Sequence, residues 1–197
     1  MKLVVATTSA HKLRELRELM SQLGLLLDVV GRDAFPGAPD VVEDGLTFAD
    51  NARLKAVALA RFTGLPSLAD DSGISVDALG GAPGVHSARW IEGSDEDRTR
   101  ALVKKIEGVP DEKRGAHYTC ALCLAMPGGP CIEVEGRCDG KIGRAFVGQG
   151  GFGYDPVFTG DDGRTFAELT AAEKNARSHR SRALAQMAPH LRELAGR

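Results

Sequence analysis

The sequence has few cysteines, few aromatic side chains and no long apolar run. Only 4 of its 197 residues are cysteine, and phenylalanine, tryptophan and tyrosine together make up 5%. No apolar run approaches the roughly 18 residues that a membrane-spanning helix needs, so we expect no membrane association. The formal net charge of −2 gives no general basic field, so we expect no stable nucleic-acid complex. Any anionic ligand therefore has to be held by local groups.

The residues that are present are typical of a globular protein. Hydrophobic residues make up 43% and charged residues 26%, and a chain of this length can bury a core without disulfides or a structural metal. We expect residues 1–197 to form a single domain. The apolar run before Thr7 is far shorter than the ~7–15 residue apolar region of a signal peptide, which predicts a cytoplasmic protein.

Cys120 and Cys123 have the Cys-x-x-Cys spacing of many zinc sites. Residues 117–126 are expected to form a strand, in which residues three apart point to opposite faces, so the two thiols cannot easily bind one metal. Free cysteines are often buried. We therefore favour buried strand thiols over a zinc site.

Apolar periodicity and helix-capping residues predict alternating strands and helices. The expected strands are residues 2–6, 25–30, 67–69, 74–76, 115–126, 131–138 and a short one near Val157. The expected helices are one that Gly24 ends, one from Thr47 to Gly64, one that Ser94 begins, and a final one. The hairpin-rich central part predicts an α/β fold with a mixed sheet flanked by helices and a cleft between two lobes.

The turn between the first strand and the first helix is polar. It comprises Thr7, Thr8, Ser9, Ala10, His11 and Lys12. Backbone N–H groups at a helix N-terminus, hydroxyl groups and a lysine can cradle phosphate oxygens. The alternative interpretation is that Ser9 only caps the helix and that Lys12 is solvated.

Two adjacent carboxylates, Asp70 and Asp71, follow an apolar strand end. Adjacent carboxylates repel each other unless a cation or hydrogen bonds offset the charge, which indicates a Mg²⁺ site. Glu43, before the long helix, is a candidate third oxygen ligand. An exposed polar turn is an equally good interpretation of the segment taken alone.

A glycine-rich loop, residues 150–156, carries the aromatic side chains Phe152 and Tyr154 on either side of Gly153. Such a loop can stack on a planar base while Asp155 reads the edge of that base. A structural turn that packs its aromatic rings into the core is the alternative.

Polar residues also gather near the start of the expected final helix. They are Lys174, Ser178, His179 and Arg180. Their donors can bind a phosphate or a keto oxygen, although an ordinary polar helix start has the same composition. Together with the segments above, they supply the parts of a metal-assisted nucleotide hydrolase.

With these motifs, the sequence resembles the inosine triphosphate pyrophosphatase family, the Ham1-like enzymes that hydrolyse non-standard purine nucleoside triphosphates. The resemblance runs nearly from end to end. The matching segments are Glu43–Phe48, Asn51-Ala52 with Lys55-Ala56, Ala69–Gly73, Gly80–Gly84 with Ser87–Arg89, Gly151–Pro156, and Lys174 with Ser178–Arg180.

The resemblance implies a homodimer that requires Mg²⁺ and hydrolyses ITP, dITP or XTP to the monophosphate and pyrophosphate, by attack of water on the α-phosphate. It implies that Asp71 accepts the proton and that Glu43 and Asp71 bind the metal. It also implies a set of substrate-binding residues, namely Thr7–Lys12, Ser72, Phe152–Asp155, Lys174, His179 and Arg180.

One segment departs from the family pattern, because Thr8 and Ser9 stand where the family usually has Gly and Asn. Ser9 offers only a shorter hydroxyl contact, and Thr8 would be strained if this position needs a positive φ.

Two alternative functions stay open. One is a Maf-like enzyme of similar fold that cleaves other nucleotides, and the other is a nucleotide sensor without catalysis.

Overall fold

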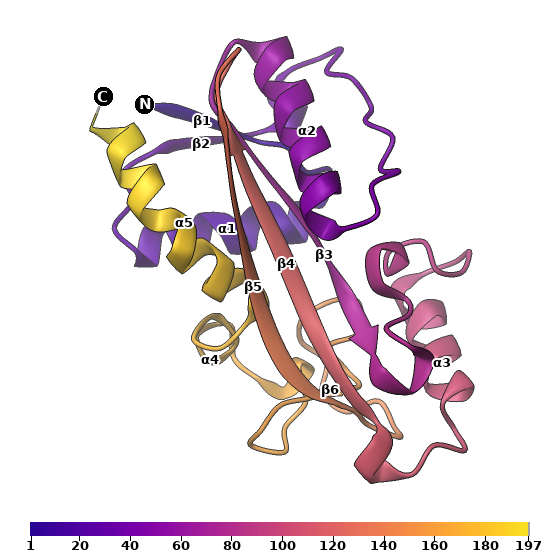
Figure 1. The fold of residues 1–197 in the computed structure, drawn as a ribbon. Coiled ribbons are helices and arrows are strands. Elements are labelled where there is room, and N and C mark those ends of the chain that lie inside the picture. Colours follow the sequence, from indigo (N-terminus) through magenta and orange to yellow (C-terminus); the bar gives the residue numbers. More distant parts are fainter. Residues whose placement is uncertain (197) are drawn as a thin grey trace. The chain divides into compact units, whose positions relative to one another are not determined.

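The computed structural model describes residues 1–196, in which strands and helices alternate as far as α3, three strands then follow one another, and two helices end the chain (Figure 1). The strands are β1 (Lys2–Val5), β2 (Asp28–Gly31), β3 (Ser67–Val76), β4 (Gly115–Ala125), β5 (Cys131–Ile142) and β6 (Phe158–Thr159). The helices are α1 (Ala10–Gln22), α2 (Phe48–Thr63), α3 (Asp95–Lys105), α4 (Ala171–Asn175) and α5 (His179–Ala195). None of these helices, within residues 1–196, is long and apolar enough to cross a membrane.

The strands of the described chain form one six-stranded sheet in the order β2-β1-β3-β4-β5-β6. β1 pairs in parallel with β2 and β3, whereas β5 pairs antiparallel with β6. A tight turn at 126–130 joins β4 to β5, with the Met126 N–H donating to the Pro130 oxygen. The predicted α/β fold with a mixed sheet and flanking helices is therefore confirmed.

The chain divides into two compact units. Unit 1 comprises Met1–Asp71, Cys120–Gly136 and the chain from Arg180 onward, and unit 2 comprises Ser72–Thr119 and Arg137–His179. The strands β3, β4 and β5 contribute residues to both units. The single domain and its interlobe cleft stay predictions.

In unit 1 the sheet is covered on both faces. Leu68 packs in a cluster with apolar residues of α1 and α5, whereas the next residue, Ala69, packs in a cluster with those of α2. Successive residues of a strand point to opposite faces, which explains this alternation. The position of a side chain along β3 therefore decides which helices it meets.

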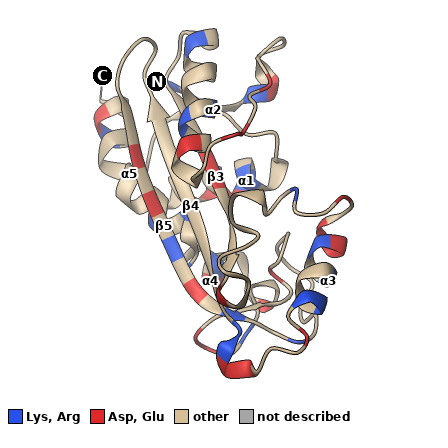
Figure 2. Ribbon diagram, turned by 45° about the vertical axis from the view of Figure 1, so that its right-hand side comes forward, with Lys and Arg blue, Asp and Glu red and all other residues tan. Residues whose placement is uncertain are grey.

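In unit 2 the core gathers around aromatic rings. Tyr118 on β4 lies 4.6 Å from Phe158 and 6.0 Å from Phe166, measured between ring centroids. Leu102 and Ile106, at the end of α3, belong to the same buried cluster. Figure 2 shows the acidic start and basic end of α3, the arrangement that the helix dipole favours.

The predicted caps are confirmed. Thr47 begins α2 and forms a capping box with Asp50, and Gly64 ends this helix in the left-handed conformation, with φ +66. Ser94 forms the corresponding box at α3. The structure shows a further capping box, of Thr170 with Glu173, at α4. The sequence predicts capping boxes well because each depends on two residues that are only three apart.

Three element predictions were wrong. Residues 70–73 do not form a polar loop between two short strands, because β3 runs without a break from Ser67 to Val76. The second strand lies at Asp28–Gly31 rather than at 25–30, and Leu25 is buried against the α1 side of the core instead. The final helical region is two helices, because α4 ends at Asn175 and α5 begins at His179.

Cys120 and Cys123 are buried strand thiols, as predicted. Cys120 belongs to the α1 and α5 side of the sheet and Cys123 to the α2 side, so the two thiols face apart. Burial raises the pKa of Cys120 to about 12. Cys138 is also buried and Cys131 is half-buried.

Candidate active site

Asp70 and Asp71 lie side by side on β3 but face opposite sides of the sheet. Asp70 Oδ2 accepts contacts from Lys12 at 3.0 Å and from Arg180 at 3.2 Å, which belong to α1 and α5. Asp71 Oδ1 lies 2.9 Å from Lys55 Nζ on α2. Because the segment is a strand, the two carboxylates do not share one cation, contrary to the simplest interpretation of an adjacent pair.

Asp71 is held by two donors from α2. Lys55 donates to Oδ1, and Asn51 Nδ2 donates to Oδ2 at 3.3 Å. Lys55 Nζ also lies 3.3 Å from Glu43 Oε2. One ammonium group therefore bridges the two carboxylates that the sequence predicted as metal ligands.

The two aspartates have different electrostatic environments, which shift their pKa values in opposite directions. Burial alone would raise the pKa of Asp70, but the charges of Lys12, Arg180 and Lys55 outweigh it and hold this pKa well below its usual range. Burial raises the pKa of Asp71 above its usual value of 3.8, with Lys55 and Lys12 opposing the shift. A carboxylate with a raised pKa is the better proton acceptor near neutral pH.

Glu43 and Asp71 fit a divalent cation. The Lys55 ammonium, within 3.3 Å of both carboxylates, shows that the space beside them accepts positive charge. Across residues 1–196 no three His, Cys, Asp or Glu side chains gather as a ready-made metal cage. Mg²⁺ commonly takes one or two carboxylates and completes its shell with water and substrate phosphates, so two carboxylates suffice.

The predicted phosphate turn lines a cavity of about 400 Å³ in unit 1. Its lining residues are Thr7, Thr8, Ser9, Ala10, Leu13, Arg32, Asp33, Phe35, Pro36, Gly37 and Ala38. Ser9 caps α1 by accepting from the Lys12 N–H at 3.4 Å, and Lys12 is not simply solvated because its ammonium pairs with Asp70. Within the described chain only glycines have a positive φ, so Thr8 carries no such strain.

Arg180 is part of a buried charge cluster in unit 1. Its guanidinium pairs with Glu15 of α1 and with Asp70, and the arginine side chain is only 1% exposed. Burial opposes the charge of Arg180, but the carboxylates of Asp70 and Glu15 outweigh burial and raise its pKa. Glu15 was not among the residues singled out from the sequence.

In unit 2, Asp155 organises the predicted base-binding loop. Its Oδ2 accepts from Lys174 Nζ at 2.7 Å and from the Phe152 N–H at 2.9 Å. Lys174 Nζ also lies 4.7 Å from the centre of the Phe152 ring, which places the ammonium over the ring face. Gly151, with φ +72, leaves room for this arrangement, because a Cβ there would lie 2.1 Å from Asp155 Oδ2.

His179 joins the same region through Tyr118. Their rings stack at 4.7 Å with an angle of 14° between the planes, and the Tyr118 hydroxyl donates to Asp155 Oδ1 at 3.3 Å. Tyr154 turns its hydroxyl to the Ser87 oxygen at 2.8 Å. Burial raises the pKa of Tyr154 to about 12, so this ring is a neutral core residue near pH 7.

Comparisons with known proteins agree with the motifs. The Ham1 family profile matches residues 3–190. The chain belongs to the Ham1 family. It is 51% identical over 198 residues to a dITP/XTP pyrophosphatase of Streptomyces coelicolor, covering 99% of each chain. It is 52% identical over 185 residues to a dITP/XTP pyrophosphatase of Symbiobacterium thermophilum, covering 94% of this chain and 92% of the relative.

Solved structures of Ham1 proteins have the same fold. A HAM1 protein from Coxiella burnetii has a TM-score of 0.87 at 38% identity, covering 98% of this chain and 99% of that one. A nucleoside-triphosphatase / dITP/XTP pyrophosphatase from Mycobacterium abscessus has a TM-score of 0.77 at 45% identity, covering 97% of this chain and all of that one. The Ham1 match favours the resemblance over the Maf-like alternative.

The structure of this Ham1-family chain groups the predicted residues by unit. Unit 1 brings together Glu43 with Asp71, and Lys12 with Asp70 and Arg180. Unit 1 also holds the remaining residues of the predicted phosphate turn, Thr7, Thr8, Ser9, Ala10 and His11. Unit 2 holds Ser72, Phe152, Gly153, Tyr154, Asp155, Lys174 and His179. Arg180 therefore packs against α1 and β3, although its neighbour in sequence, His179, stacks in unit 2.

Lys55 and Asn51, which contact Asp71, were not predicted as site residues. The sequence did contain a signal, because the two residues are one helical turn apart and each directly precedes a buried alanine, Ala52 or Ala56. Polar side chains beside a buried apolar stripe need partners. In this Ham1 protein that partner is Asp71.

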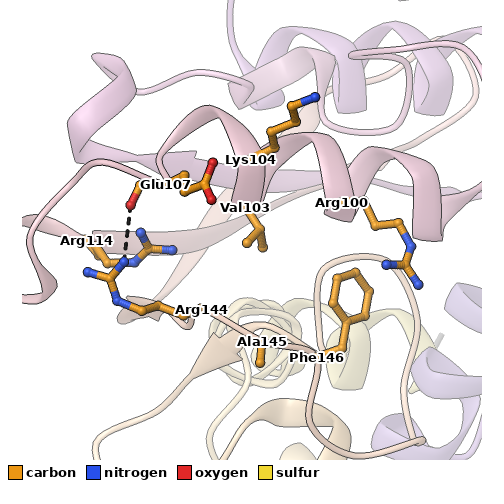
Figure 3. A pocket seen from close by; sticks show the side chains of 8 residues that line it. All are labelled: Arg100, Val103, Lys104, Glu107, Arg114, Arg144, Ala145 and Phe146. Atoms are coloured by element: carbon orange, nitrogen blue, oxygen red, sulfur yellow. Dashed lines mark hydrogen bonds between the residues drawn. The ribbon is translucent and has the colours of Figure 1, made fainter.

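A second cavity, of about 740 Å³, lies in unit 2 (Figure 3). It is lined by Arg100, Val103, Lys104, Glu107, Arg114, Arg144, Ala145 and Phe146. The Arg114 guanidinium donates to three main-chain oxygens, and that of Arg144 donates to Asp111 and to two main-chain oxygens of the segment that follows α3. The guanidinium groups of Arg114 and Arg144 already have acceptors within the Ham1 chain. This cavity is therefore a weaker anion site than its arginine and lysine side chains suggest.

Proposed function

We propose that this chain hydrolyses non-standard purine nucleoside triphosphates, such as dITP, ITP and XTP, to the monophosphate and pyrophosphate. The observation that carries the proposal is the Glu43–Lys55–Asp71 arrangement in a chain of the Ham1 family. Relatives that match over nearly the whole chain bear the name dITP/XTP pyrophosphatase. Two kinds of observation therefore support the proposal: the sequence similarity to these relatives and a local geometry that suits metal-assisted hydrolysis.

Asp71 is the proton acceptor in this proposal. Its raised pKa favours taking a proton from the water that attacks the α-phosphorus, and the donors Lys55 and Asn51 fix the direction in which its carboxylate points. Proton transfer to a positioned side chain contributes typically 10²–10⁴-fold to a rate. Lys55 Nζ, next to this carboxylate, also offsets negative charge that develops on phosphate oxygens.

Glu43 and Asp71 would hold a divalent cation, for which we propose Mg²⁺. When bound, such a cation supplies Lewis-acid polarisation of the phosphate and a lower pKa for the attacking water. The residues Thr7–Lys12 would hold the triphosphate, with the N-terminus of α1 and the Lys12 ammonium facing the anion. Pairing with Asp70 keeps the Lys12 side chain extended toward β3.

The residues of unit 2 would hold the base. Phe152 supplies a ring for stacking, and the buried donors of Lys174 and His179 suit a purine 6-keto oxygen. The 6-amino group of adenine would leave such a donor unpaired, and a site built on hydrogen bonding can discriminate by up to roughly 10⁴-fold. Ser72, Gly153, Tyr154 and Asp155 complete the proposed substrate contacts, and a homodimer in the cytoplasm is proposed from the family resemblance.

The test is to measure pyrophosphate and orthophosphate released from ITP, dITP, XTP, GTP and ATP, with Mg²⁺ and with a chelator. The expected result is metal-dependent pyrophosphate from the first three substrates and much less from ATP. Guanine also carries a 6-keto oxygen, so weak turnover of GTP would require a further element that recognises its 2-amino group. Release of orthophosphate would mean that the wrong bond was assigned. Binding of ITP without any release would favour the nucleotide sensor, and faster turnover of methylated UTP would favour the Maf-like alternative.

A further inference from the structure

Asn51 connects the two segments that carry the proposed metal ligands. Its side chain is fully buried on α2. Oδ1 accepts from the Gly45 N–H at 2.9 Å, and Nδ2 donates to Asp71 Oδ2 at 3.3 Å. One carboxamide therefore joins the loop that contains Glu43 to the strand that contains Asp71.

Asn51 and Lys55 act on Asp71 from one face of α2, because residues four apart in a helix are neighbours on its surface. Lys55 donates to Oδ1 and Asn51 to Oδ2. A carboxylate held at both oxygens by one helix has a fixed position and a fixed plane. The capping box of Thr47 and Asp50 orders the first turn of that helix.

The contact with the loop is close. A Cβ at Gly45 would lie 2.7 Å from Asn51 Oδ1 and 2.5 Å from the Cβ of Asp50. Any other residue at this position would push the loop away from α2. Glu43 is two residues from Gly45, so the same hydrogen bond limits how far Glu43 can move from Asp71.

We propose that Asn51 is a positioning residue that holds Glu43 and Asp71 in register for a divalent cation. The catalytic part of this inference rests on the proposed function, whereas its geometry does not. The position requires an acceptor for Gly45 and a donor for Asp71 on one short side chain. Asparagine provides both, ionised aspartate provides only acceptors, and leucine provides neither.

The experiment uses Asn51→Leu, which removes both hydrogen bonds at similar size, and Asn51→Asp, which keeps the acceptor for Gly45 and removes the donor to Asp71. Three quantities are measured in the full chain: hydrogen exchange of the Gly45 amide, Mn²⁺ affinity by calorimetry without nucleotide, and kcat and KM for ITP. Arg61→Gln is the control, because it changes the net charge as Asn51→Asp does but lies exposed near the end of α2.

In Asn51→Leu the Gly45 amide is expected to exchange faster, and Mn²⁺ affinity and kcat to fall roughly 10–100-fold, as is typical when a residue that orients metal ligands is lost. In Asn51→Asp the Gly45 amide stays protected while kcat still falls. Arg61→Gln leaves all three quantities unchanged.

Wild-type Mn²⁺ affinity and kcat in a folded Asn51→Leu protein would overturn the proposal. If that variant does not fold, a wild-type kcat in Asn51→Asp would overturn it instead. If the wild-type protein itself releases no pyrophosphate from ITP, the proposed function fails, and Gly45 exchange with Mn²⁺ affinity still decides the role of Asn51.

Discussion

Asp70 and Asp71 are consecutive in the chain, yet folding shifts their pKa values in opposite directions. Asp70 meets Lys12 and Arg180 on the α1 and α5 side of β3, and these cations hold its pKa low against the effect of burial. Asp71 meets the α2 side, where burial raises its pKa despite Lys55. One carboxylate is therefore suited to an ion-pair network and the other to proton transfer.

Asp71→Asn should lose roughly two to four decades of ITP turnover, the typical contribution of a general base. The measurement is kcat for pyrophosphate release at saturating ITP and Mg²⁺. The same substitution should leave the metal-free protein at least as stable as wild type. Near-wild-type turnover would exclude Asp71 as the proton acceptor.

The stability expected for Asp71→Asn follows from the raised pKa of Asp71. A carboxyl group whose pKa is raised on folding contributes stability that is fully present below its unfolded value of 3.8 and is lost as the pH rises through the folded value. At pH 7 the ionised Asp71 therefore costs stability, and asparagine removes that cost. Thermal unfolding with chelator compares the two proteins, and a clearly lower Tm for the variant contradicts the argument.

Asp70→Asn should have the opposite effect, with a loss of about 3–5 kcal/mol in the free energy of unfolding, because the buried Arg180 loses one of its two carboxylates. Asp70 has a lowered pKa, so its contribution is present above pH 3.8 and is lost as the pH falls through the folded value. Urea unfolding at pH 7 measures the loss of unfolding free energy, and urea unfolding in acid measures how that loss depends on pH. Equal stability of variant and wild type at pH 7 would contradict this prediction and would mean that Glu15 alone satisfies the buried charge of Arg180.

The sequence predicts the helix caps and the hairpin because their partners are close in the chain, such as Thr47 with Asp50. It does not predict the partners of Asp70, because Lys12 and Arg180 are far from it in sequence and reach it only through packing. The adjacent acidic residues looked like a turn, and their strand conformation follows from pairing with a neighbouring strand rather than from local preference.

Gly73→Ala should destabilise the protein by about 1–3 kcal/mol, the usual cost of overpacking. A Cβ at this position would lie 2.3 Å from Ser87 Oγ and 2.6 Å from the Gly84 oxygen. Ser87 cannot move freely, because its hydroxyl accepts from the Ile74 N–H at 2.9 Å and donates to the Gly84 oxygen at 2.6 Å. Thermal unfolding checks this, with Gly108→Ala as the control because no atom lies within 4 Å of its added Cβ.

Tyr118→Phe should raise KM for ITP by up to about tenfold, or 1.4 kcal/mol, with little change in kcat. The substitution removes the hydroxyl that donates to Asp155 Oδ1 and keeps the ring that stacks on His179. Asp155 then keeps only its Oδ2 contacts, so its hold on Lys174 and on the Phe152 N–H becomes less rigid. Steady-state kinetics with ITP measures the effect. A fall in kcat at constant KM would place the hydroxyl in the chemical step rather than in base binding, and a matched loss of Tm without any kinetic change would make the bond purely structural.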